Sequence, residues 1–294
     1  FTEALLSLDN AFLQSIDPRL ISTAVTLLFV GIAYVGADFA LRIQFFILAV
    51  LAFGLGSFFV GAISTFGQVS TPALMPIEGF DSSQFWIVFA IFFPAVTGIE
   101  IGVSLSGDLK DPSKSIPFGT IASIIFTAII YIAVTVLFAF NLTNEQLLGD
   151  SLAMRRLAII PQAILAGVWA STLSSALGSV LAAPRTLQAI ANDDVVPRWM
   201  ANNLGSKTEP RAAVLITGAI AFVVIWAGDL NAVAPIISMF FLNTYGMVNL
   251  TSAIEKVVGN PSYRPRFRIP WYISFLGAVG CYGAMFLINT PAPI

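Results

Sequence analysis

The sequence predicts an all-α membrane protein, and three observations lead to this prediction. Of the 294 residues, 57% are hydrophobic and only 10% are charged, whereas soluble domains carry roughly 25% charged residues. Apolar segments of about 20 residues, the length that crosses a bilayer core, recur from end to end. Long segments of alternating polarity, which a transmembrane β-barrel requires, are missing.

Hydropathy predicts eight spans, each an apolar run bounded by polar or charged residues. In chain order they are Leu20 to Ala37, Ile43 to Ile63, Phe85 to Ser106, Ile116 to Phe140, Ala163 to Ala183, Ala212 to Ala227, Val233 to Ala253, and Trp271 to Ile288. We therefore expect residues 1–294 to form a single transmembrane domain. Because the chain begins Phe1-Thr2-Glu3 without an initiator Met, we expect it to be a fragment that starts within a longer protein.

The basic residues support this order of spans, because cytoplasmic loops retain an excess of Lys and Arg. Eleven fall in one set of alternating loops, namely Arg42, Lys110, Lys114, Arg185, Arg198, Lys207, Arg211, Lys256, Arg264, Arg266 and Arg268. The other set holds three, namely Arg19, Arg155 and Arg156. This division places both ends of the chain outside, in a multi-pass protein of the plasma or cell membrane.

Composition and motifs exclude several functions. The net charge is -2 and no run of five basic residues occurs, so no nucleic-acid partner is indicated. Histidine is absent and Cys281 is the only cysteine, which argues against a transition-metal site and leaves a carboxylate as the proton carrier, if protons move. Neither a Walker loop nor a dinucleotide fingerprint appears, and a serine triad lacks its His. We therefore expect that the protein is not an enzyme and that it binds no cofactor.

The third span is interrupted, because Pro94 removes a backbone donor and Gly98 loosens the helix one turn later. In secondary transporters the backbone groups freed by such a break bind the substrate or ion. The alternative is a proline kink repaired by neighbouring helices. Glu100 follows in the same span, where a carboxylate costs several kcal/mol and normally faces a cavity, a partner or an ion. If the span ends earlier, Glu100 instead lies near the surface.

Two further spans carry polar groups that suit ions. The fifth places Ser171, Ser174 and Ser175 at helical spacing on one face with small residues. Such a face most often serves close helix packing, although hydroxyl oxygens are also suitable ligands for a small hard cation. In the seventh span the hydroxyl of Tyr245 could donate to an anion from mid-membrane. An aromatic-belt tyrosine is the alternative.

Together these residues resemble the cation-chloride cotransporters, of the amino acid-polyamine-organocation superfamily. The likeness lies in Phe92 to Gly98, Ser106 to Pro112 with Ser115 to Pro117, Ser171 to Leu177, Ala183 to Ala189, and Ala234 to Ser238 with Tyr245. The resemblance implies a fold of two inverted five-helix repeats plus two trailing helices. This chain would hold the later part and would lack the first, second, most of the third and the twelfth helices.

The resemblance also implies the ion sites. Potassium would be held by Pro94 and Thr97, and chloride by Gly98, Ile99 and position 100 together with Tyr245. Sodium, in the sodium-dependent members, would use Ser171, Ser174 and Ser175, and this paired-serine pattern favours sodium dependence. One position departs from the family, because Glu100 stands where an apolar residue is usual. A carboxylate there would repel an anion unless it is protonated, so Glu100 either replaces that chloride or couples transport to a proton.

The function expected from the resemblance is secondary active symport of Na⁺ and K⁺ with Cl⁻. Two alternatives stay open: an amino-acid permease of the same superfold, with Glu100 near the substrate, and a non-transporting membrane subunit that binds a partner. The partners expected are small inorganic ions and the lipid bilayer, and a homodimer stays open as an assembly.

Overall fold

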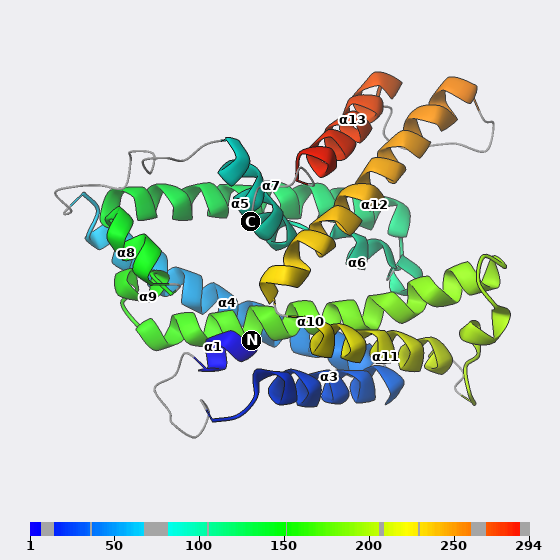
Figure 1. The fold of residues 1–294 in the computed structure, drawn as a ribbon, viewed down its shortest axis with the longest axis horizontal. Helices are drawn as coiled ribbons and strands as arrows, with labels where there is room; N and C mark the ends of the chain where they lie inside the picture. Colours follow the sequence, from blue (N-terminus) through cyan, green and yellow to red (C-terminus); the bar gives the residue numbers. More distant parts are fainter. Residues whose placement is uncertain are drawn as a thin grey trace. The chain divides into compact units, whose positions relative to one another are not determined.

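The computed structural model describes residues 1–6, 15–35, 37–67, 82–104, 106–150, 152–205, 209–228, 230–259 and 269–288. Within these ranges the regular secondary structure is helical and no strand occurs. The elements, of which Figure 1 labels the α-helices, are α1 (Thr2–Leu6), α3 (Pro18–Val35), α4 (Ala37–Ser64), α5 (Ser82–Phe92), η1 (Phe93–Val96), α6 (Ile99–Ser104), η2 (Ser106–Asp108), α7 (Pro112–Asn141), α8 (Asn144–Gly149), α9 (Met154–Leu157), α10 (Pro161–Asn192), η3 (Arg198–Ala201), α11 (Arg211–Ala227), α12 (Leu230–Val258) and α13 (Trp271–Ile288).

Seven segments of the described residues are long and apolar enough to cross a bilayer. They are Pro18–Val35, Ile43–Ser64, Gln84–Ser104, Pro112–Asn141, Pro161–Asn192, Val233–Val258 and Trp271–Ile288. The remaining predicted span is α11, an apolar helix of 17 residues. At 1.5 Å per residue it is about 25 Å long, slightly less than the roughly 30 Å of a bilayer core. Seven of the eight predicted spans thus correspond to one helix each, the sixth being the shortest of these, and the third corresponds to α5, η1 and α6.

The chain divides into two compact units, and the interrupted helix contributes to both. The first unit comprises Phe1–Ile77 and Glu100–Ala227, and the second comprises Glu78–Ile99 and Gly228–Ile294. Helix α5 and η1 therefore belong to the second unit, whereas α6 lies almost wholly in the first.

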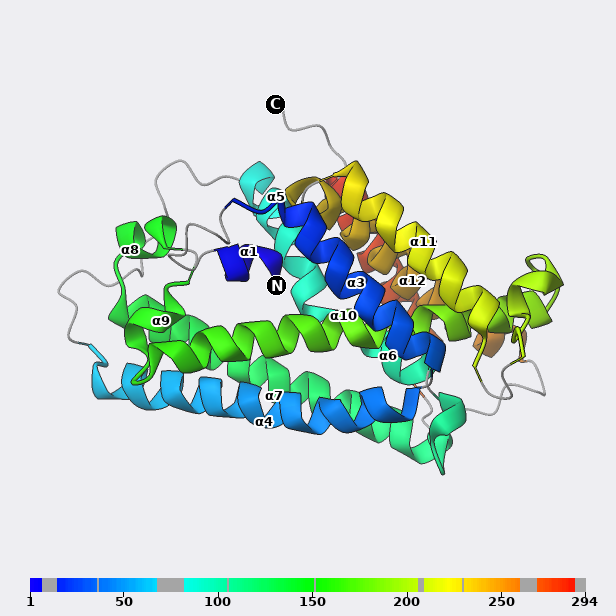
Figure 2. The ribbon, with the colours of Figure 1, turned by 90° about the horizontal axis from the view of Figure 1, so that it is seen from below.

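Helices α4 and α10 run side by side in the first unit, as Figures 1 and 2 both show. Glycines allow the close approach. A Cβ atom on Gly54 would lie 2.8 Å from the carbonyl oxygen of Ala163, near the start of α10. Further along α4, a Cβ atom on Gly61 would overlap the carbonyl oxygen of Leu157, which ends the preceding helix α9. Small residues at a helix interface let membrane helices approach closely where the hydrophobic effect does not drive them together. The α4–α10 pair is consequently held backbone to backbone.

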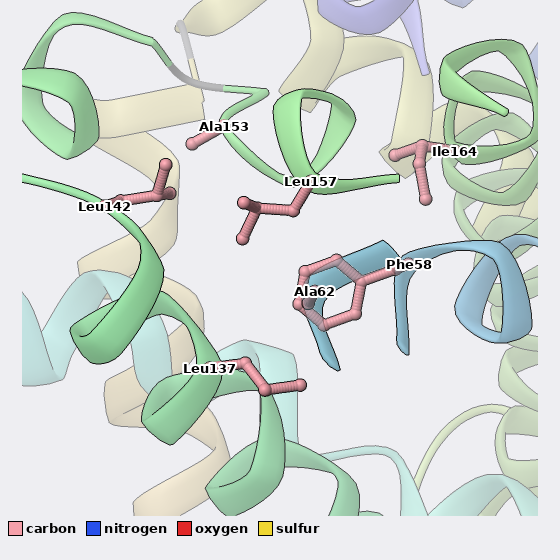
Figure 3. Packing of buried hydrophobic residues seen from close by; sticks show 7 residues of the cluster. All are labelled: Phe58, Ala62, Leu137, Leu142, Ala153, Leu157 and Ile164. Atoms are coloured by element: carbon pink, nitrogen blue, oxygen red, sulfur yellow. The ribbon is translucent and has the colours of Figure 1, made fainter. Parts of the chain in front are cut away.

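The two buried clusters of the first unit lie at different helix contacts. One joins α3, α10 and α11 through Phe29, Ala33, Leu177, Leu181 and Val214. The other, drawn in Figure 3, gathers Leu137, Leu142, Ala153, Leu157 and Ile164 around Phe58 and Ala62 of α4. Side chains in these clusters replace lipid contacts with protein contacts, so they fix which helix faces meet.

The second unit is built on α12. Its Gly246 faces Tyr282 of α13, because a Cβ atom at Gly246 would lie 3.0 Å from the Tyr282 ring. Gly277 of α13 lies against Asn249 in the same way, at 2.9 Å from the side-chain oxygen. Helix α12 also packs against α5. At this contact the hydroxyl of the fully buried Ser238 donates a hydrogen bond to the carbonyl of Ala90. This bond ties the first half of the interrupted helix to α12.

Candidate functional site

The predicted interruption of the third span is present. Helix α5 ends at Phe92, and Phe93–Val96 forms a single 3-10 turn that begins next to Pro94. Thr97 is extended, with φ -100° and ψ -175°, and Gly98 has φ 107°. A positive φ of that kind is accessible to glycine at little cost and strains other residues. Pro94 and Gly98 therefore both contribute to the break, and α6 restarts at Ile99.

The two predicted potassium ligands lie next to each other in this break. The carbonyl oxygen of Pro94 accepts a hydrogen bond from the Thr97 hydroxyl at 2.7 Å and a second from the Thr97 backbone amide at 3.3 Å. A carbonyl group at a break lacks the amide donor that a continuing helix would supply, so a local donor or a bound cation must satisfy its lone pairs. The geometry presents two oxygens of the same short loop together, as a cation site requires.

Glu100 lies in the first turn of α6. The sequence predicts that Glu100 lies within the third span, and the structure places it at the start of the second half-helix, inside the apolar segment Gln84–Ser104, with a half-buried side chain. A carboxylate in the first turn interacts favourably with the helix dipole. Glu100 thus complements the same amino end that, in the predicted chloride site, would receive an anion together with Gly98 and Ile99.

Helix α6 docks on α10 within the first unit. A Cβ atom on Gly178 would lie 3.4 Å from the side chain of Ile101, and the hydroxyls of Ser104 and Thr186 lie 3.1 Å apart in a hydrogen bond. The half-helix that carries Glu100 is therefore attached to the helix that carries the predicted sodium residues.

Tyr245 lies beside the break in the second unit. Its ring meets that of Phe93 edge to face, with centroids 6.4 Å apart, and stacks on Phe241 at 6.1 Å. Tyr245 is half-buried, and its carbonyl accepts a hydrogen bond from Asn249 at 2.9 Å. Tyr245 lies near the middle of the apolar segment Val233–Val258. Within this unit the fold brings its ring against Phe93, which belongs to the same turn as Pro94.

The predicted sodium residues line an open pocket of about 400 Å³ between α4 and α10. Its polar lining consists of Ser171, Ser174, Ser175 and Gln44, and its apolar lining of Phe45, Ile47, Leu48 and Leu51. The Ser171 hydroxyl donates to the carbonyl of Val168 at 3.0 Å, and the Ser174 hydroxyl donates to the side-chain oxygen of Gln44. The fold thus brings the three serines to one cavity.

Gln44 is the site residue that sequence reasoning missed. It comes from α4, 130 residues before its partner Ser174. The available signal was a lone uncharged amide between Ile43 and Phe45 at the start of an apolar span. Such an amide needs a hydrogen-bond partner inside a membrane protein, but the sequence does not say which helix supplies it.

These features define a class of protein. Large apolar side chains project from the helices into the surroundings, with Phe118, Phe126 and Ile132 of α7 at 77%, 66% and 65% exposed, as lipid-facing residues are. Such helices, with a break at the centre of one of them, identify a multi-pass integral membrane protein of the helical transporter type.

Comparison with known proteins agrees with this class. The model of a family described as "Amino acid permease" matches residues 3–293. Potassium/chloride cotransporter 3 of Caenorhabditis elegans is 38% identical over 226 residues, which cover 72% of this chain and 21% of that protein. Solute carrier family 12 member 1 of Rattus norvegicus is 30% identical over 330 residues, covering 93% of this chain and 30% of the relative. Solute carrier family 12 member 2 of Homo sapiens is 30% identical over 327 residues, covering 93% and 27%.

The chain belongs to the amino acid permease family, and the resemblance to the cation-chloride cotransporters is confirmed. These relatives are named as a cotransporter and as solute carriers, and none is named as an enzyme, in agreement with the expectation from the motifs. The chain spans between about a fifth and a third of the length of these relatives.

Proposed function

We propose that the protein containing this chain is a symporter that carries an inorganic cation across the membrane together with chloride. The observation that carries this proposal is the oxygen pair at the break, where the Thr97 hydroxyl lies 2.7 Å from the Pro94 carbonyl in mid-span. A relative named as a potassium/chloride cotransporter, 38% identical over 226 residues, supports potassium and chloride as the ions.

We assign potassium to Pro94 and Thr97, and chloride to Gly98, Ile99 and position 100 with Tyr245. The edge-to-face contact between Phe93 and Tyr245 supports the chloride assignment, because it brings the phenol's ring to the turn that precedes Gly98. A tyrosine hydroxyl and backbone amides are donors, and donors are what a halide needs.

Sodium is assigned to Ser171, Ser174 and Ser175. The support is their common pocket and the presence of a fourth oxygen-bearing side chain, Gln44, in its wall. The name of the Caenorhabditis elegans relative mentions potassium and chloride without sodium. Sodium coupling is therefore a finer proposal than cation-chloride symport itself, and the two are tested separately.

A second candidate is amino-acid transport, because the family model that matches residues 3–293 is described as an amino acid permease. In such a transporter the break would bind the charged ends of the substrate: the helix amino end at Ile99 would receive the carboxylate, and Glu100 would lie near the amino group.

The test is uptake of radioactive rubidium, as a potassium substitute, into cells or liposomes that contain the full-length protein. We expect uptake to fall to background when chloride is replaced by gluconate. In a separate experiment with chloride present, we expect uptake to fall when sodium is replaced by N-methylglucamine. Chloride dependence without sodium dependence would remove only the sodium assignment. Uptake of labelled amino acids without rubidium uptake would favour the permease, and absence of any flux from a correctly folded protein would favour a non-transporting subunit.

Replacing Glu100 with leucine tests the anion site. A fixed carboxylate repels an anion in a site of low effective dielectric, so Glu100→Leu is expected to make uptake more strongly chloride-dependent. The measurement is rubidium uptake against chloride concentration. Glu145→Leu is the matched control, since Glu145 is also a first-turn carboxylate but belongs to the short helix α8 outside the spans. Identical chloride curves for both variants would show that Glu100 does not occupy the anion site.

A further inference from the structure

Gln44 and Ser174 form a reciprocal pair across the α4–α10 contact. The Gln44 amide nitrogen lies 3.4 Å from the Ser174 carbonyl oxygen and donates to it, while the Gln44 side-chain oxygen accepts the Ser174 hydroxyl proton. A carbonyl oxygen only accepts, so the amide end that faces it must be the nitrogen. The orientation of the Gln44 amide, and hence the direction of the hydroxyl bond, is fixed by the backbone of α10.

The pair determines what the Ser174 hydroxyl can offer to the pocket. A hydroxyl has one donor proton and two acceptor lone pairs, and here the proton is used by Gln44. Ser171 is in the same condition, because its proton goes to the Val168 carbonyl. Two of the three serine hydroxyls that line the pocket, those of Ser171 and Ser174, are therefore held as acceptors, which is the state that a cation requires and an anion does not.

The backbone around this pair allows little adjustment. Gly54 and Gly167 bring α4 and α10 together, with a Cβ on Gly54 at 3.6 Å from the Gly167 Cα atom. Leu51, in the pocket wall, touches the same contact. The distance between α4 and α10 is thus set by the contact of Gly54 with Gly167, so Gln44 does not need to hold the two helices together.

We propose that Gln44 is a positioning residue of the sodium pocket, which holds the Ser174 hydroxyl so that its oxygen and not its proton is presented to the cation. This inference rests on the proposed sodium assignment. Groups that orient metal ligands through hydrogen bonds typically change metal affinity on the order of 10- to 100-fold when they are removed. Gln44 would set the affinity of the pocket for sodium without itself being required for potassium or chloride.

The test compares Gln44→Met with Leu51→Met in the full-length protein. Methionine is unbranched, so it fills the space of glutamine, but its thioether is only a weak acceptor for the Ser174 proton and cannot donate to the Ser174 carbonyl. Leu51→Met introduces the same residue on the same α4 wall of the pocket without removing a polar group, so it reports the effect of repacking that wall alone. We expect the sodium concentration for half-maximal rubidium uptake to rise on the order of tenfold in Gln44→Met. The half-saturation values for rubidium and chloride, and the maximal rate per folded transporter, should be unchanged.

Gln44→Glu is expected to retain the sodium affinity that Gln44→Met loses, because a carboxylate oxygen can still accept the Ser174 proton. Its sodium half-saturation should be equal to or lower than that of the unaltered protein. Equal sodium half-saturation in Gln44→Met and Leu51→Met, with sodium-dependent uptake in the unaltered protein, would overturn the role of Gln44 and leave the proposed function intact. A Gln44→Glu variant as impaired as Gln44→Met would also overturn it. Sodium-independent uptake by the unaltered protein would overturn the sodium assignment and this inference with it.

Discussion

Replacing Thr97 with valine is expected to raise the rubidium concentration for half-maximal uptake by about 10- to 100-fold. Valine keeps the β-branched shape of threonine but removes the hydroxyl that lies 2.7 Å from the Pro94 carbonyl. Interactions of a hydroxyl with a charged group contribute roughly 1.5–3 kcal/mol, and about 1.4 kcal/mol corresponds to a factor of ten in affinity. The backbone bond from the Thr97 amide to Pro94 does not involve the side chain, so the break itself should persist.

The measurement is rubidium uptake as a function of rubidium concentration at saturating chloride and sodium. Thr97→Ser should restore most of the affinity, because it returns the hydroxyl. Thr127→Val is the control: the Thr127 hydroxyl bonds to the Ser123 carbonyl on an exposed face of α7, away from any candidate ligand. If Thr97→Val has the half-saturation of the unaltered protein, Thr97 is not a cation ligand.

Replacing Gly61 with alanine is expected to destabilise the fold strongly, although it adds only one methyl group. Alanine normally favours a helix over glycine by about 1 kcal/mol. At Gly61, however, the added Cβ would overlap the carbonyl oxygen of Leu157 and would lie 2.9 Å from the amide nitrogen of Ile159. Both are backbone atoms, and Ile159 is tied to α4 by a bond to the Ser57 carbonyl at 3.2 Å. Relief therefore requires α4 and the segment before α10 to separate.

Overpacking of a well-packed contact typically costs about 1–3 kcal/mol, occasionally more, and at Gly61 it outweighs the gain in helix propensity. The expected result is a lower thermal unfolding midpoint and less monodisperse full-length protein in detergent, measured by fluorescence-detected gel filtration after heating. Gly56→Ala is the matched control on the same helix, because nothing lies within 4 Å of its added Cβ. Equal midpoints for the two variants would show that α4 does not approach Leu157 so closely.

Much of the fold could be predicted from hydropathy, because each membrane helix satisfies its own backbone and needs an apolar run of defined length. The bounds predicted for the last span, Trp271 to Ile288, are those of α13. The fifth was predicted to end at Ala183, but α10 continues through the buried Pro184 to Asn192. Polarity marks where a helix leaves the apolar region, whereas the helix itself ends only where its hydrogen bonding ends.

The candidate site was predictable where its chemistry is local. Pro94 and Gly98 predict the break within one stretch of sequence, because each acts on its own backbone. The contacts of Gln44 with Ser174 and of Phe93 with Tyr245 were not predictable, since both join different helices. A polar or aromatic residue in an apolar span shows that a partner is needed, but its identity depends on which helix faces meet.

The central claim, that cation and chloride move together, is tested most directly by the converse flux. Liposomes containing the full-length protein, with sodium on both sides and the membrane potential clamped at zero, are given an inward rubidium gradient, and uptake of radioactive chloride is followed. Coupled symport predicts that chloride accumulates above its equilibrium concentration and that the accumulation disappears when the rubidium gradient is removed. Chloride uptake that never exceeds equilibrium, or that is the same with and without the rubidium gradient, would contradict the claim.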